Sequence, residues 1–229
     1  TKGMLGYSSR AEVAAEIAAA KQAQAGSRAK LEKASLEQIR TQPDLLEFAL
    51  AGGRSAYNVN CSQCHGSGAQ GFAGYPNLND DEWLWGGALL DIQKTITHGI
   101  RNLDDEDARV SDMPAFLKDE ILTKAQIGDT ADYVLKLSGQ EHDAAAAERG
   151  QALYAENCVD CHGDTGGGNM ELGAPALNNG IWLYGGDKAT IADTIANSRG
   201  GVMPAWGKIL DPITVKQLAV YIHSLGGGR

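Results

Sequence analysis

Two short stretches of the chain each place a pair of cysteines two residues apart, with a histidine directly after them. The stretches are Cys61-Ser62-Gln63-Cys64-His65 and Cys158-Val159-Asp160-Cys161-His162. On a helical turn, positions i, i+3 and i+4 lie on one face, so the sulfurs and the imidazole of each stretch are expected to converge. This pentapeptide is a signature of c-type haem attachment, in which the histidine becomes an axial iron ligand. The pattern predicts two covalently bound haem c groups and chemistry of the electron-transfer kind.

Two other kinds of site use paired cysteines, namely zinc sites and thioredoxin-like redox pairs. A single zinc ion would need ligands from both pairs, which lie far apart in the chain, and both pairs keep their histidine. A thioredoxin-like pair needs a strand followed by a helix, and the sequence around neither pair predicts one. Haem attachment is therefore favoured over both alternatives.

The second axial ligand of each iron has to come from elsewhere in the chain. Met113 and Met203 occupy matching positions, and Pro and Ala follow each of them. A thioether is a soft ligand, and His/Met ligation raises the reduction potential of haem iron. The alternative is that a methionine only fills core space. We predict Met113 and Met203 as ligands. The simplest pairing keeps each within its own repeat, although exchange between closely spaced repeats stays open.

The remaining candidates for axial ligands do not recur in this way. Met4 and Met170 have no counterparts, so we expect surface or local packing for them. Of the other histidines, His98 faces an asparagine in the second copy, and neither His142 nor His223 recurs. Bis-histidine ligation is the less favoured alternative, and His98 is expected to pack or hydrogen-bond near its haem.

An internal repeat surrounds the two cysteine pairs and indicates two copies of one domain. The matching landmarks are Gly53-x-x-x-Tyr57-x-x-x-Cys61 with Gly150-x-x-x-Tyr154-x-x-x-Cys158, Pro76-x-Leu78 with Pro175-x-Leu177, Trp83-Leu84-Trp85-Gly86-Gly87 with Trp182-Leu183-Tyr184-Gly185-Gly186, Met113-Pro114 with Met203-Pro204, and Tyr133 with Tyr221. They keep their order along the chain. The first copy carries an acidic insertion around residues 104–107.

Each copy reads as helical, and no stretch alternates with period two. We predict an all-α fold with a helical segment at 1–43 and cytochrome domains at 44–139 and 140–229. The expected helices begin near Leu46 and Ala144 and cover 89–97, 190–197, 124–137 and 214–225. In the first segment, Ala11–Ala23 and Lys30–Arg40 read as two helices separated by Gly26-Ser27.

Other repeated residues have side chains suited to supporting a haem. Pro76 and Pro175 are expected to offer a carbonyl oxygen to the histidine ring, and Arg101 and Arg199 to pair with propionates. Ordinary core or surface placement is an equally good interpretation for each residue alone. The remaining members of this group are the packing or pocket-lining side chains Leu78, Leu177, Trp83, Trp85, Trp182 and Tyr184.

The net charge and the hydropathy of the chain limit the classes of partner that we expect it to bind. The formal net charge is −9, which makes nucleic acid an unfavourable partner and favours a basic docking face, although such a charge also serves solubility alone. No apolar run approaches the roughly 20 residues that a membrane span needs. The chain starts at Thr1, so we read it as a processed protein or a piece of a longer one.

The attachment motif, Pro-x-Leu and Met-Pro resemble class I cytochromes c over residues 46–227. Further motifs resemble the CcoP/FixP subunit of cbb3-type cytochrome c oxidases over nearly the whole chain. They are Thr1-Lys2-Gly3-Met4-Leu5-Gly6-Tyr7-Ser8-Ser9-Arg10, Phe48-Ala49-Leu50-Ala51-Gly52-Gly53, Asn79-Asp80-Asp81-Glu82-Trp83-Leu84-Trp85-Gly86-Gly87 and Gly201-Val202-Met203-Pro204-Ala205-Trp206-Gly207.

The resemblance implies a dihaem subunit that is held in the bacterial inner membrane by an N-terminal helix and faces the periplasm. It would pass electrons from a donor cytochrome c or quinol-cytochrome c reductase towards the monohaem subunit and the oxygen-reducing catalytic subunit. No catalytic residue of its own is expected. The anchor is missing from this sequence, which we therefore read as the soluble periplasmic part. A free soluble dihaem carrier and a dihaem peroxidase remain as alternatives.

Overall fold

Helices form the framework of the chain, for which this computed structural model describes residues 8–226. Between residues 8 and 226 only isolated β-bridges occur, with no strands, so the predicted all-α class is confirmed. The helices are α1 (Ser9–Lys33), α2 (Leu36–Thr41), α3 (Pro43–Asn60), α4 (Ser62–His65), α5 (Leu89–His98), α6 (Lys124–Leu137), α7 (Ala144–Asn157), α8 (Val159–His162), α9 (Lys188–Asn197), the 3₁₀ turn η1 (Trp206–Lys208) and α10 (Pro212–His223).

Polar side chains fix where many of these helices begin. Ser35 and Thr123 each form a reciprocal capping box with a glutamine three residues later, at the starts of α2 and α6. Aspartates cap α7, α9 and α10 by accepting bonds from otherwise unpaired backbone N–H groups. The helix starts are therefore encoded locally in the sequence.

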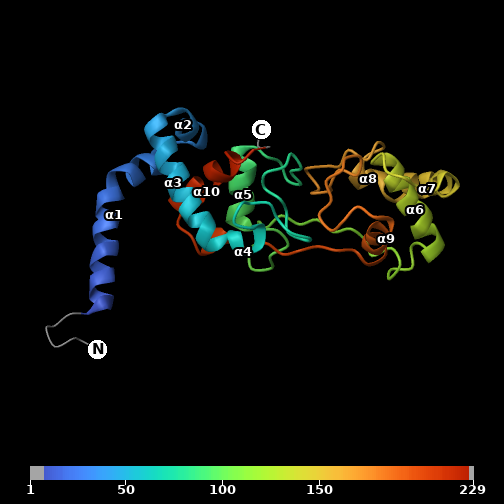
Figure 1. The fold of residues 1–229 in the computed structure, drawn as a ribbon, viewed down its shortest axis with the longest axis horizontal. Coiled ribbons are helices and arrows are strands. Elements are labelled where there is room, and N and C mark those ends of the chain that lie inside the picture. The colour runs from blue at the N-terminus through green and yellow to red at the C-terminus, as the bar shows by residue number, and fades with distance from the viewer. Residues whose placement is uncertain (1–7, 227–229) are drawn as a thin grey trace.

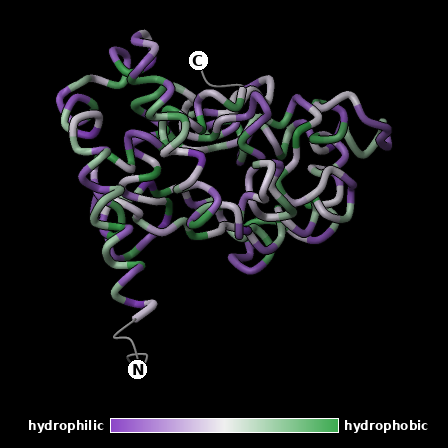
Figure 2. The backbone as a smooth tube through the Cα atoms, turned by 60° about the vertical axis from the view of Figure 1, so that its left-hand side comes forward, coloured by the Kyte–Doolittle hydropathy of each residue, from purple (hydrophilic) through white to green (hydrophobic). Residues whose placement is uncertain are grey.

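The N-terminal segment differs from the expectation. The predicted break at Gly26-Ser27 is wrong, because α1 continues through Gly26 to Lys33 and the chain turns only at Ala34 and Ser35. A glycine costs a helix about 1 kcal/mol, and the alanine-rich neighbours offset that cost. Hydrophilic and hydrophobic residues mix along α1 (Figure 2), and Leu31 is its one buried residue. Met4 and most of the opening motif lie outside the described residues.

The helices pack into two units that do not follow the order of the repeat (Figure 1). In the first, which we call the Cys61 unit, α3 packs on α10, and α10 also packs on α5. In the second, the Cys158 unit, α6 packs on α7 and α9. Because α6 comes from the first copy of the repeat and α10 from the second, the last helices of the two copies are exchanged. The packing thus crosses the expected boundary between 44–139 and 140–229.

Two glycines permit the close approach of the exchanged helices. A Cβ atom on Gly53 of α3 would lie 2.3 Å from the backbone oxygen of Gln217 on α10. A Cβ atom on Gly150 of α7 would lie 2.1 Å from the backbone oxygen of Asp129 on α6. The two contacts occupy equivalent repeat positions, so both units form the same helix crossing with exchanged partners.

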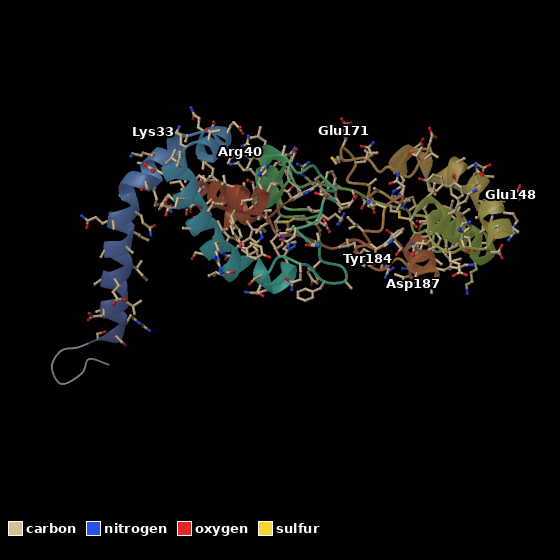
Figure 3. All side chains as sticks on the ribbon, turned by 45° about the horizontal axis from the view of Figure 1, so that its top comes forward. Lys33, Arg40, Glu148, Glu171, Tyr184 and Asp187 are labelled. Atoms are coloured by element: carbon tan, nitrogen blue, oxygen red, sulfur yellow. The ribbon has the colours of Figure 1, made fainter. Side chains whose placement is uncertain are left out.

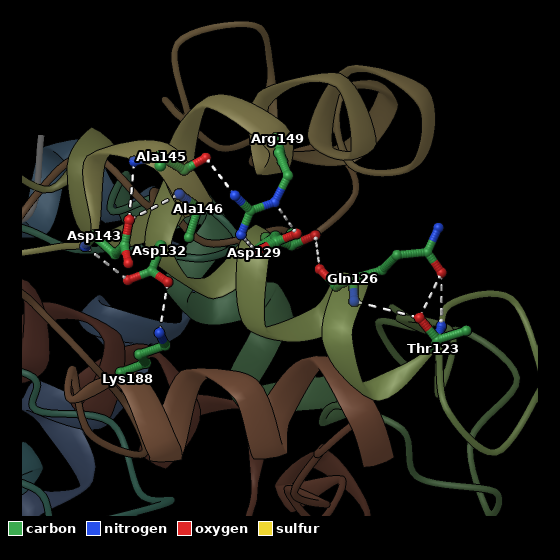
Figure 4. Close-up of polar contacts among 10 residues, drawn as sticks. Thr123, Gln126, Asp129, Asp132, Asp143, Ala145, Ala146, Arg149 and Lys188 are labelled. Atoms are coloured by element: carbon green, nitrogen blue, oxygen red, sulfur yellow. Dashed lines mark hydrogen bonds and ion pairs between the residues drawn. The ribbon is translucent and has the colours of Figure 1, made fainter.

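A polar network adds to the packing of the Cys158 unit (Figure 4). The buried Asp132 of α6 accepts a 2.6 Å bond from Lys188 Nζ at the start of α9 and a 3.2 Å bond from the backbone N of Asp143. Arg149 of α7 pairs with Asp129 of α6 at 2.6 Å. These contacts connect α6, from the first copy, to α7 and α9 of the second copy.

Candidate functional site

Each Cys-x-x-Cys-His stretch forms a single helical turn at the end of a long helix. The turn α4 follows α3 and the turn α8 follows α7, with backbone bonds from His65 N to Cys61 O and from His162 N to Cys158 O, both 2.9 Å. All four cysteines are free thiols. In each pair the second cysteine is exposed, and burial raises the pKa of the first, Cys61 or Cys158, to about 11. In residues 8–226 the two pairs belong to separate units, and they are not among the side chains that converge as a metal-binding group.

The two histidine rings are oriented in the same way. His65 Nδ1 lies 2.9 Å from the carbonyl oxygen of Pro76, and His162 Nδ1 lies 2.9 Å from that of Pro175, which confirms the predicted proline contacts. A carbonyl only accepts, so Nδ1 carries the proton and Nε2 keeps its lone pair. Burial lowers the pKa of both imidazoles, against a smaller raising effect of the carbonyl contact, which favours the neutral, ligand-competent ring.

Two tyrosines hold the turns that follow the histidines. Tyr57 donates its hydroxyl to the carbonyl of Gly66 at 2.7 Å, and Tyr154 donates to Gly163 at 2.9 Å. Both glycines have positive φ, 82° and 75°, a conformation that favours glycine. The repeat had marked Tyr57 and Tyr154 as landmarks without giving them a role. Their spacing of four residues before the first cysteine was the available signal.

The two methionines lie with the opposite copies of the repeat. Met113 lines a cavity of about 920 Å³ together with Cys158, Cys161 and His162. Met203 packs against the core cluster that contains Cys61 and Tyr57. It is fixed there by two backbone bonds with Ile100, 3.1 Å and 3.0 Å long. Each methionine therefore lies in the unit that holds the cysteine pair of the other copy.

The segments around each methionine continue this exchange. Phe116 and Leu117, which follow Met113, donate backbone bonds to Ile195 and Ala196 at the end of α9, both 3.1 Å. Residues just before the methionines have not yet crossed, since Arg109 contacts Asp91 of its own copy. The crossing thus occurs over residues 110–113 and 200–203.

Arg101 and Arg199 were expected to pair with propionates as matching residues of the repeat, and this match needs correction. Arg199 stacks on Tyr184 with its guanidinium carbon 4.6 Å from the ring centroid and contacts Thr194. Arg109, not Arg101, makes the equivalent contacts, stacking on Trp85 at 5.2 Å and bonding Thr95 at 2.9 Å. The acidic insertion had shifted the match, because both Arg109 and Arg199 stand four residues before a methionine.

Arg101 also lines the cavity that contains Met113 and His162, and it contacts the crossing segment of the second copy. Its Nε donates to the carbonyl of Gly201 at 2.7 Å. Tyr184 also lies between the two groups of helices (Figure 3), where a Cβ atom on Gly74 would be 3.3 Å from its ring. On the other side of the pseudo-symmetric contact, Trp85 covers Gly173. These expected pocket residues therefore shape the contact between the units as well.

The other predicted lining residues divide between the units. Leu78 and Trp83 pack on the core of the Cys61 unit, and Leu177 and Trp182 on that of the Cys158 unit. The indole nitrogen Nε1 of Trp83 is buried and has no hydrogen-bond partner. A buried donor without an acceptor is costly, so this nitrogen points to an acceptor supplied by a bound group.

The histidines outside the two motifs contact other polar groups. His98 Nδ1 contacts Asp105 of the acidic insertion at 3.1 Å, and His142 Nδ1 contacts the carbonyl of Gln140 at 2.8 Å. His223 lies beside Arg40 in a surface pocket. Met170 is more than half exposed, as expected.

The chain contains no candidate membrane-spanning helix in its described part, and it matches two families of cytochromes. Among the helices of residues 8–226, none combines the length and the apolarity needed to cross a membrane. The family described as cytochrome C oxidase, cbb3-type, subunit III matches residues 145–222, and the family cytochrome c matches residues 50–138. Both copies of the repeat are therefore matched by cytochrome families.

Whole-chain relatives carry the same description. The chain is 53% identical to the Cbb3-type cytochrome c oxidase subunit CcoP of Azospirillum brasilense, covering all of this chain and 80% of the relative. It is 54% identical to the subunit FixP of Azorhizobium caulinodans, covering 78% of it, and 48% identical to the CcoP of Cereibacter sphaeroides, covering 79%. The chain belongs to the CcoP/FixP family of cbb3-type cytochrome c oxidase subunits.

Proposed function

We propose that the chain is a dihaem electron-transfer subunit that passes electrons from a donor cytochrome c towards the oxygen-reducing subunit of a cbb3-type oxidase. The observation that carries this proposal is the duplicated arrangement of two free thiols and an oriented imidazole on one turn. The relatives are named as oxidase subunits, which supports the other oxidase subunits as partners and a membrane complex as the location. The chain itself relays electrons and does not reduce oxygen.

The side chains present fit haem c. Two thiols on one helical face are placed to form thioethers, and the adjacent imidazole keeps Nε2 for iron. The cavity of about 920 Å³ beside Cys158 is mostly apolar, as a macrocycle requires. The unpartnered Nε1 of Trp83 fits a propionate oxygen as its acceptor. Haem iron, when bound, takes up and releases one electron between its ferric and ferrous states.

We further propose that the ligand pairs are crossed, so that His65 and Met203 would hold one haem iron and His162 and Met113 would hold the other. The cavity shared by Met113 and His162 supports the second pair, and the packing of Met203 on the Cys61 cluster supports the first. Each methionine supplies a soft sulfur ligand that raises the reduction potential. Because each pair joins the two copies of the repeat, neither site is complete without both copies.

The remaining residues orient these ligands. The Pro76 and Pro175 carbonyls accept a hydrogen bond from Nδ1–H, which holds each ring and would increase its basicity as a ligand. The hydroxyls of Tyr57 and Tyr154 fix the glycine turns that follow, and so limit movement of both histidines. Small rearrangement between redox states is what an electron carrier needs.

Haem staining and a pyridine-haemochrome assay test this proposal. The protein is produced in cells that attach haem c, and we expect two covalent haems per chain. Any other number contradicts the proposal. The reduced protein should bind no carbon monoxide at either haem, because both irons have two protein ligands, and binding would instead support the peroxidase alternative. Expression of the complete gene with an affinity tag should recover the other oxidase subunits, whereas recovery of a free protein would favour the independent carrier.

A further inference from the structure

One carboxylate reaches from the Cys61 unit into the backbone of the Cys158 unit. Glu82 Oε1 accepts a 3.0 Å bond from the backbone N of Ala176, and Oε2 accepts a 2.7 Å bond from Asn179 Nδ2. Both carboxylate oxygens therefore accept a hydrogen bond, and together they hold the two ends of the segment 176–179. We call these two bonds the Glu82 link. Bonds to an ionised carboxylate are stronger than those between neutral groups.

The Glu82 link joins residues that are adjacent to both sites. Ala176 directly follows Pro175, whose carbonyl holds His162 Nδ1 at 2.9 Å. Glu82 directly precedes Trp83, which packs on the core of the Cys61 unit and has the unpartnered Nε1. Glu82 also lines the cavity that contains Met113 and His162. A displacement of the carboxylate would therefore be transmitted through one peptide unit to the carbonyl that orients His162.

The Glu82 link occurs in one direction only. Trp83 matches Trp182 in the repeat, so the counterpart of Glu82 is Ile181, which has no hydrogen-bonding side chain and is 38% exposed. The segment before Pro76 is held from the other unit by a neutral backbone bond, from Gly74 N to Leu183 O at 2.7 Å, and not by a carboxylate. The Glu82 link is a built asymmetry in an otherwise pseudo-symmetric contact, and it distinguishes the His162 site from the His65 site.

We propose that Glu82 is a positioning residue for the His162 site: through Ala176 and Asn179 it holds the Pro175 carbonyl, and thereby sets the orientation and basicity of the His162 ring. The proposal rests on the proposed haem at this site. Second-shell groups of this kind tune a bound metal through the basicity and orientation of its ligand. Removing the link is expected to change the electronic properties of one haem while the other stays the same.

The test compares Glu82→Ala and Glu82→Gln with Asp81→Asn in the complete two-haem protein. Asp81 is the exposed neighbour of Glu82. Its change to Asn therefore removes one negative charge at the adjacent position and leaves the Glu82 link in place. The measurements are the EPR g values and the reduction potentials of both haems, together with amide exchange at Ala176. Leu177, whose backbone N bonds Gly166 O at 2.6 Å, serves as the internal exchange reference.

In Glu82→Ala we expect the signal of the haem attached at Cys158 and Cys161 to shift and its potential to change, while the other haem is unaltered. The Ala176 amide should exchange at least tenfold faster, while Leu177 keeps its rate. Glu82→Gln retains one acceptor oxygen and should give a smaller shift of the same haem. Asp81→Asn should leave the g values of both haems as in the parent. If Glu82→Ala does not take up haem, the smaller shift in Glu82→Gln decides.

Three outcomes would overturn the proposal. They are unchanged g values and potentials in both Glu82 variants, an unchanged exchange rate at Ala176, and an equal shift of the same haem in Asp81→Asn, which would show a charge effect alone. A parent protein without two covalent haems would instead contradict the proposed function, so the two failures are distinguishable.

Discussion

The exchange of the last helices makes a specific prediction about which aromatic side chains are energetically coupled. The rings of Tyr57 and Tyr221 have centroids 5.6 Å apart, and those of Tyr133 and Tyr154 are 5.1 Å apart. Each pair joins the first copy of the repeat to the second. A fold without exchange would instead pair Tyr57 with Tyr133 and Tyr154 with Tyr221, since these lie within single copies.

The perturbation is a double-mutant cycle with Tyr57→Leu and Tyr221→Leu. Aromatic pairs at such separations contribute about 0.5–1.5 kcal/mol beyond their buried area, and that is the coupling we expect. Tyr57→Leu also removes the hydroxyl bond to Gly66, at a cost of about 1 kcal/mol, but this term is present in both arms and cancels. The matched control cycle combines Tyr57→Leu with Tyr133→Leu, which lies in the other core cluster.

The assay is guanidinium unfolding of the two-haem protein, followed by far-UV circular dichroism, with the free energy of unfolding taken from linear extrapolation. Residues that share no partners are additive within about 0.3–0.5 kcal/mol, so the control cycle should show no larger coupling. Coupling in the Tyr57–Tyr133 cycle together with additivity in the Tyr57–Tyr221 cycle would refute the exchanged packing.

Two further predictions concern the helices of the Cys158 unit. Gly150→Ala should destabilise the protein by about 1–2 kcal/mol, because crowding against Asp129 outweighs the gain in helix propensity. Gly128 on α6 has open space around it, so Gly128→Ala should stabilise the protein by about 1 kcal/mol. Thermal unfolding checks the sign of both changes, and stabilisation by Gly150→Ala would contradict the close crossing of α6 and α7. The pKa of Asp143, which caps α7, is lowered, and the main cause is the hydrogen bond that its carboxylate accepts from the backbone N–H of Ala146. The stability that this cap contributes should therefore be fully present above the unfolded-state pKa of about 3.9, and it should be lost as the pH falls through the lower folded-state pKa. Asp143→Asn should flatten that part of the plot of unfolding free energy against pH. An unaltered plot would argue against the cap.

Much of the fold could be predicted from local sequence. The helices expected at 89–97 and 124–137 end within one residue of α5 and α6, because their apolar period and their caps agree. The two histidine-to-proline contacts were also predicted, since Pro76 and Pro175 each stand two residues before a leucine at matching places in the repeat, 11 and 13 residues after their histidines. The haem ligands themselves remain predictions, supported by where the side chains lie.

The exchange could not be predicted, for a physical reason. Tyr133 and Tyr221 occupy the same repeat position, so each presents a similar surface to Tyr57 or to Tyr154, and local sequence cannot choose between the pairings. The choice rests on contacts of single residues that break the repeat, such as the Lys188 bond to Asp132. The insertion in the first copy likewise hid the equivalence of Arg109 and Arg199, because it moved Arg109 out of register.

The crossed axial pairs are the central claim, and single-haem variants test it most directly. With Cys61→Ser and Cys64→Ser, only the haem at Cys158 and Cys161 is attached. The measurement is the near-infrared methionine-to-iron charge-transfer band after replacing either methionine by leucine. The account predicts that Met113→Leu abolishes the band in this background and Met203→Leu leaves it. Loss of the band with Met203→Leu and its retention with Met113→Leu would contradict the crossed pairing.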